Sequence, residues 1–132
     1  LLGRGDYLDA AVATLKSGAN IMQKAPLATG QLLLALDFNL GPAFELVLAG
    51  DLECDPGRQV LRDVHSHYLP NCLLAACDLG VKSPQLLCDV FAGKDAIGGQ
   101  PTLYVCENFA CREPTVGSDQ IKQRLAELAA SP

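Results

Sequence analysis

The first forty residues carry two helical patterns of apolar positions. Within Leu8–Met22, apolar side chains recur every three or four residues, which predicts one face of a helix that Asp6 can cap. Pro26 ends this helix, because the residue before a proline is pushed out of the α region. A second helix follows and is apolar almost all round at Leu32–Phe38. We therefore predict a helical hairpin at residues 1–42 with uncovered apolar surface, as in a fragment of a longer protein.

The remaining residues, 43–132, alternate short apolar runs with helical patterns. The runs have the length and composition of buried strands, and they lie at residues 44–49, 72–76 and 102–106. A helix is predicted after each run, beginning at Asp55-Pro56, at Ser83-Pro84 and at Ser118. Such alternation with short connections predicts parallel strands with right-handed crossovers. The expected fold class is α/β: an N-terminal helical hairpin followed by a small three-stranded parallel βαβαβα unit.

The order of the three strands decides whether two candidate residues meet. Asp51 follows the first strand, and Cys106 ends the third. With the order 2-1-3, both residues would flank one crevice at the carboxyl edge of the sheet, where open α/β sheets bind ligands. The order 3-2-1 would separate them. Asp51 could act there as a general base or could cap the next helix, and capping is the commoner use of such a residue.

Cys106 and Cys111 converge on a predicted strand and loop, and three interpretations of them stay open. They could be structural thiols, a redox pair, or half of a zinc site. A redox pair would lie near the N-terminus of the helix capped by Ser118, because the helix dipole lowers a thiol pKa. Their C-x4-C spacing differs from the C-x-x-C of redox motifs, and zinc would need a second pair of ligands. We therefore favour structural thiols.

The sequence predicts no metal, no cofactor and no complete catalytic set. His65 and His67 lie two positions apart on a predicted helix, so their imidazoles would point to opposite sides. The turn at Gly50–Gly57 has neither a G-x-G-x-x-G motif nor a P-loop lysine, and no serine lies in a nucleophile elbow. We therefore do not expect this chain to be an enzyme by itself.

Composition and charge argue against several classes of partner. Of the 132 residues, 49% are hydrophobic and 19% are charged, as in a compact globular domain. A net charge of −5 without a basic stripe argues against nucleic-acid binding. No apolar stretch approaches the ~18 residues of a membrane span. The six cysteines are irregularly spaced in a chain that can build its own core, so we expect reduced thiols and a cytoplasmic protein.

Several stretches resemble the C-terminal part of the long thioredoxin-domain-containing proteins. The most specific is Tyr104–Pro114, which reads YVCENFACREP. The weaker ones are Tyr7–Ala11, the segment Gln31–Phe38 with the following Gly-Pro pair, and the strand that ends at Gly50-Asp51. Together they extend the resemblance over essentially the whole chain.

This resemblance implies an upstream thioredoxin-like domain and an (α/α)6 toroid similar to N-acylglucosamine 2-epimerases and six-hairpin glycosidases. Residues 1–42 would be the last hairpin of the toroid, and residues 43–132 would be its C-terminal appendage. The rest of the same polypeptide would then be the partner of this chain. The main hypothesis is a structural or interaction segment. The alternatives are a thiol-redox contribution from Cys106 and Cys111, and part of a carbohydrate-active enzyme, which rests on fold analogy.

Overall fold

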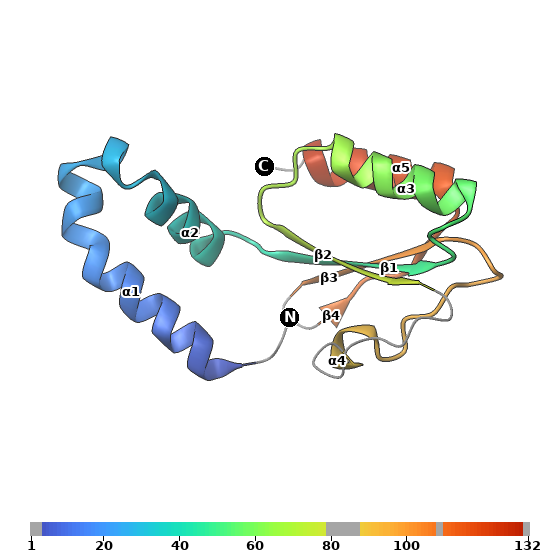
Figure 1. The fold of residues 1–132 in the computed structure, drawn as a ribbon, viewed down its shortest axis with the longest axis horizontal. Coiled ribbons are helices and arrows are strands. Elements are labelled where there is room, and N and C mark those ends of the chain that lie inside the picture. Colours follow the sequence, from blue (N-terminus) through green and yellow to red (C-terminus); the bar gives the residue numbers. More distant parts are fainter. Residues whose placement is uncertain (1–3, 79–87, 108–109, 131–132) are drawn as a thin grey trace. The chain divides into compact units, whose positions relative to one another are not determined.

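The structure is a computed structural model that describes residues 4–78, 88–107 and 110–130. The chain forms two compact units (Figure 1). One is the helical hairpin of residues 3–43, and the other is the α/β unit that begins at Phe44. Each unit is described by itself below. No helix among the described residues is long and apolar enough to cross a membrane.

The hairpin consists of two α-helices joined by one turn of 3₁₀-helix. These elements are α1 (Gly5–Lys24), η1 (Pro26–Ala28) and α2 (Gly30–Leu40). As predicted, α1 ends just before Pro26, where the amide of Ala25 still donates to the Ile21 carbonyl at 2.8 Å. The helices approach closely at Gly18, because a Cβ atom there would lie 3.1 Å from Leu32 Cδ1. The two predicted N-terminal helices are confirmed.

Most apolar side chains of the hairpin are not covered within the structure. In α1 only Leu15 and Met22 are buried, and α2 has no buried residue. Six large apolar side chains are between 53% and 101% exposed, and we call them the hairpin apolar surface: Tyr7, Leu8, Ile21, Leu27, Leu34 and Leu40. Two helices packed only on each other leave this much apolar area in water because each covers one side of the other.

The α/β unit is built on one mixed sheet with the strand order β2-β1-β3-β4, and β5 also pairs with β3. β1 and β2 are parallel, whereas β3 runs antiparallel to β1 and is itself paired antiparallel with β4 and β5. The strands are β1 (Phe44–Gly50), β2 (Cys72–Asp78), β3 (Thr102–Glu107), β4 (Ala110–Cys111) and β5 (Thr115–Val116). The mixed α/β class is confirmed, but the simple three-stranded parallel sheet is wrong.

The direction of β3 follows from how the chain returns to the sheet. β2 ends with Asp78 beside Gly50, and β3 begins with Thr102 beside Ala49. The chain therefore leaves and re-enters at the same edge, which makes β3 antiparallel. The predicted crossover helix is represented by α4 (Cys88–Phe91), and its predicted start at Ser83-Pro84 lies outside the described residues.

Two helices lie side by side over one face of the sheet, as Figure 1 shows: α3 (Asp55–Ser66) and α5 (Ser118–Ala130). The strand residues that alternate toward this face pack against apolar residues of both helices, and all are at most 9% exposed: Leu46, Leu48, Val60, Val64, Leu103, Val105, Ile121, Leu125 and Leu128. A smaller cluster forms on the other face, where Val90 from α4 meets Val47, Ala49, Ala75, Tyr104 and Cys106. The two central strands are thus buried on both faces.

Candidate functional site

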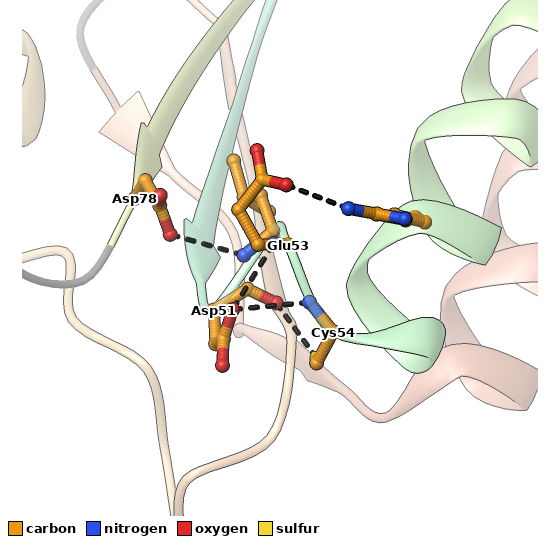
Figure 2. Close-up of polar contacts among 6 residues, drawn as sticks. Asp51, Glu53, Cys54 and Asp78 are labelled. Carbon is orange, nitrogen blue, oxygen red and sulfur yellow. Dashed lines mark hydrogen bonds and ion pairs between the residues drawn. The ribbon is translucent and has the colours of Figure 1, made fainter.

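The carboxylate predicted at the end of the first strand fixes the loop that leads into α3. Asp51 Oδ1 accepts hydrogen bonds from the amides of Glu53 at 3.0 Å and Cys54 at 3.1 Å (Figure 2). The Cys54 thiol donates to the Asp51 carbonyl at 2.9 Å. Asp51 therefore fixes the loop before α3, whereas the N-cap residue of this helix is Cys54 and no side chain caps it.

A second carboxylate from the neighbouring strand supports the same loop. Asp78, the last residue of β2, accepts a hydrogen bond from the Leu52 amide at 3.1 Å through Oδ1 (Figure 2). The loop also packs tightly on the first turn of α3, because a Cβ atom at Gly57 would lie 2.1 Å from the Asp51 carbonyl oxygen. Sequence reasoning missed Asp78, although it ends the second apolar run just as Asp51 follows the first.

The predicted crevice between Asp51 and Cys106 is not formed. Because β3 is antiparallel to β1, Cys106 pairs with Glu45 near the start of β1, whereas Asp51 follows its end. The strand order 2-1-3 is the observed one, yet it separates the two residues by the length of the strand. The expectation that 2-1-3 brings them together depended on a parallel third strand and is wrong.

A pocket of about 500 Å³ lies between the first turns of α3 and α5. Its lining includes Cys54, Gln100, Ser118 and Asp119, and the Ser118 hydroxyl donates to the Pro56 carbonyl across it at 3.5 Å. The described residues that line it contribute one thiol and one carboxylate but no imidazole, amine or guanidinium group.

Cys106 and Cys111 are joined by a disulfide, with their Cα atoms 3.9 Å apart. They are directly opposite residues of the β3–β4 ladder. The expectation of reduced thiols is therefore wrong for this pair, and sulfurs bonded to each other do not act as zinc ligands. The sequence could not give this result, because two cysteines five positions apart can form a disulfide only if the intervening chain turns back.

The disulfide does not lie near the helix that the redox interpretation required. β5 pairs with Thr102 and Leu103 at the beginning of β3, and α5 starts directly after β5. Cys106 is at the other end of β3, so the dipole of α5 acts on the opposite edge of the sheet. The helix that begins at Ser118 is therefore not placed to stabilise a thiolate of Cys106 as the redox interpretation required.

The remaining candidate ligands do not gather. His65 is exposed on α3, and His67 ends this helix with Nδ1 2.7 Å from the Asp63 carbonyl oxygen. Cys54 and Cys72 are free thiols, and burial raises the pKa of the Cys72 thiol. The part of the chain that the structure describes holds no group of three or more side chains that could bind a metal ion.

Comparison with known proteins gives a match to one kind of protein. No family model matches the chain, and no solved structure does. The chain is 28% identical to spermatogenesis-associated protein 20 of Homo sapiens over 126 residues, which are 93% of this chain and 16% of the human protein. The proteins of the same name from Rattus norvegicus and Mus musculus are 27% and 26% identical over 95% and 93% of this chain.

The chain thus spans about 16% of the length of the curated relatives that it matches. The sequence motifs pointed to the C-terminal part of proteins of this kind, and the match to spermatogenesis-associated protein 20 confirms that resemblance. The chain is a homologue of a C-terminal part of this longer protein, spermatogenesis-associated protein 20.

Proposed function

We propose that this chain is a structural and interaction segment whose helical hairpin docks onto the rest of its own longer polypeptide. The observation that carries the proposal is the hairpin apolar surface, above all Leu27 and Leu34, which are 101% and 61% exposed. The homologues supply the occupant, because in them the corresponding segment is only 16% of a longer chain. We assign no reaction to the segment itself.

The energetics of the hairpin favour a partner. Burying one leucine or isoleucine side chain contributes about 1.5–3 kcal/mol, and six large apolar side chains are exposed here. A helix the length of α2, 11 residues, is marginal in water unless an apolar face is packed against a neighbour. Since a partner in the same polypeptide needs no encounter from solution, even a modest apolar contact would hold the hairpin in place.

The resemblance suggests which part of the polypeptide this partner is. It implies that residues 1–42 complete an (α/α)6 toroid, in which each helix packs between neighbouring helices. The nearly all-round apolarity of α2 suits such a position, because a helix covered on several sides has no need of a polar face. The carbohydrate-active alternative has no such support from the described residues.

The proposal is tested by comparing this 132-residue chain with a longer polypeptide that contains it. The substitution Leu34→Glu places a charge on the hairpin apolar surface. In the short chain it should change the free energy of unfolding by no more than about 0.5 kcal/mol, because the side chain is already in water. In the long polypeptide it should destabilise the hairpin by several-fold more, since the charge would have to be buried.

Gln31→Glu, an exposed position one turn away on α2, is the matched control and should have a small effect in both lengths. Hydrogen exchange of the α2 amides gives the second readout, and it should slow by at least about tenfold in the long polypeptide. Equal exchange in both lengths, or a Leu34-dependent dimer of the short chain that persists in the long one, would overturn docking within one polypeptide.

A further inference from the structure

We propose that the Cys106–Cys111 disulfide is a thiol–disulfide exchange site that reacts with external dithiols through Cys111. The proposal is independent of where the hairpin docks, because both cysteines belong to the α/β unit. It assigns a function to the motif Tyr104–Pro114, which contains both cysteines and has no role in the docking proposal.

The disulfide links two strands at directly facing positions. Cys106 is in β3 and Cys111 in β4, and the Arg112 amide donates to the Val105 carbonyl at 2.9 Å in the next pair of the ladder. Cys106 and Cys111 therefore occupy a non-hydrogen-bonded pair, where opposing side chains come closest. The pairing of β3 with β4 thus places the two cysteines opposite each other, where a disulfide between them can form.

The two sulfur atoms differ in access to solvent. Cys106 is 2% exposed and belongs to the apolar cluster with Val47 and Tyr104, whereas Cys111 is exposed on a two-residue strand. Cys111 is therefore the residue of the pair that an incoming thiolate can approach from solvent, whereas Cys106 is covered. In this exchange Cys111 would be the sulfur that is attacked, and Cys106 would be the leaving sulfur. Exposed disulfides are also reduced more readily than buried ones.

The charged side chains near the disulfide do not control how external thiols reach it. Arg112 is ion-paired with Glu107 at 3.3 Å and lies over the ring of Phe44 at 5.8 Å. Because side chains alternate along a strand, Glu107 and Arg112 lie on the sheet face opposite to Cys106 and Cys111. Exposure rather than a neighbouring cation therefore sets the reactivity of this site.

The exchange balances with a dithiol as the reductant. One thiolate of the dithiol attacks the Cys111 sulfur, which forms a mixed disulfide and breaks the bond to Cys106. The Cys106 sulfur leaves and takes up one proton, because a buried thiol is more stable than a buried thiolate. The second thiolate of the dithiol then attacks the other dithiol sulfur, which is bonded to Cys111 in the mixed disulfide. This breaks the bond to Cys111, which leaves as a thiolate and takes up a proton from water. Two electrons pass to the protein disulfide, and the dithiol becomes a disulfide.

The fold can tolerate both redox states. Ala110 and Cys111, the two residues of β4, are both exposed, so release of this strand removes little apolar surface from the core. The main core, between the sheet and α3 and α5, contains neither cysteine. Reduction should therefore act locally, on the end of β3 that faces β4.

The first experiment follows the disulfide in the folded chain. After purification without a reductant, alkylation in denaturant should leave Cys106 and Cys111 unmodified, and mass spectrometry should recover these two cysteines as a linked pair. Dithiothreitol should then reduce this pair without loss of the circular dichroism of the fold. Alkylation of all six cysteines, or reduction no faster than global unfolding, would overturn the proposal.

The second experiment tests the entry sulfur with single variants. With oxidised glutathione, Cys111 in the variant Cys106→Ser should form a mixed disulfide at least about tenfold faster than Cys106 does in Cys111→Ser. Arg112→Gln is the matched control and should leave the rate of dithiol reduction unchanged in the chain with both cysteines. Equal rates for the two serine variants, or a slower reduction of Arg112→Gln, would contradict entry through Cys111 by exposure.

Discussion

The two units of the molecule differ in where their stabilising contacts come from. The α/β unit buries Leu48, Leu103 and Leu125 completely, each from a different element of the fold. The hairpin has about forty residues, yet among its apolar side chains only Leu15 and Met22 are buried. One unit is a domain with a core of its own, whereas the other has the surface of a part cut from a larger core.

Their helices show the same contrast. α3 carries polar residues such as Arg62 and His65 on its exposed side and apolar ones against the sheet, so solvent and core each receive a suitable face. In α2, leucines point in nearly every direction, and Leu34 and Leu40 are exposed. A helix of the second kind gains stability from each neighbour that covers it, and this is the basis of the docking that we propose.

The largest expected effect comes from truncating matched leucines in the two units. Leu125→Ala removes a fully buried side chain between the sheet and α3, and it should lower the free energy of unfolding by about 2–5 kcal/mol. Leu27→Ala removes a side chain that is 101% exposed, and this substitution should change the free energy of unfolding by at most about 0.5 kcal/mol. Urea unfolding followed by circular dichroism measures both. Similar losses would show that the hairpin has more internal packing than its exposure indicates.

Two glycines give a contrast of intermediate size. A Cβ atom at Gly57 would lie 2.1 Å from a backbone oxygen, so Gly57→Ala should destabilise the α/β unit by about 1–3 kcal/mol. Gly30, at the start of α2, has no atom within 4 Å of such a Cβ, and Gly30→Ala should stabilise the hairpin by about 0.5 kcal/mol through lower chain entropy. Thermal unfolding, with hydrogen exchange to separate the units, tests both signs. A neutral Gly57→Ala variant would mean that the loop before α3 can move.

The smallest effect is the pH dependence of the first turn of α1. The Arg4 guanidinium, bonded to Asp6 at 2.8 Å, holds the pKa of this carboxyl below its ordinary value of 3.8. Since the folded pKa is lowered, the contribution of Asp6 is complete above pH 3.8 and is lost as the pH falls through the folded pKa. Asp6→Asn should abolish this step in the NMR shifts of the first turn of α1. A carboxyl that titrates at the ordinary value in the folded chain would contradict the ion pair.

The sequence predicted where the helices and strands lie better than it predicted the direction of each strand in the sheet. Apolar periodicity located the helices α1, α2, α3 and α5, and apolar runs located the strands β1, β2 and β3. Both signals arise because buried positions carry apolar residues at the spacing of the helix or strand. An apolar run carries no record of the direction in which it crosses the sheet. Direction depends on the connection, and the stretch of more than twenty residues between Asp78 and Thr102 is long enough either for a crossover to a parallel strand or for a return at the same edge.

The site was predictable only where local chemistry decided it. An aspartate between a strand and a helix is expected to bond nearby amides, and the carboxylate of Asp51 accepts two amides of that loop, although it does not cap α3. The disulfide depends on a turn between Cys106 and Cys111 and on β4, which is too short to leave a pattern. The supporting role of Asp78 depends on the pairing of β1 with β2, which is a property of the whole sheet.

The antiparallel pairing of β3 with β1 has a consequence for synthesis of the chain. β1 and β2 can pair as soon as α3 has formed between them, but β3 emerges from the ribosome more than twenty residues after β2 ends. At the usual rate of translation this takes about one to five seconds. During that interval the inner edge of β1, with its row of leucine and valine side chains, has no partner strand. The nascent chain is therefore most prone to edge-to-edge aggregation in this window, before Thr102 becomes available.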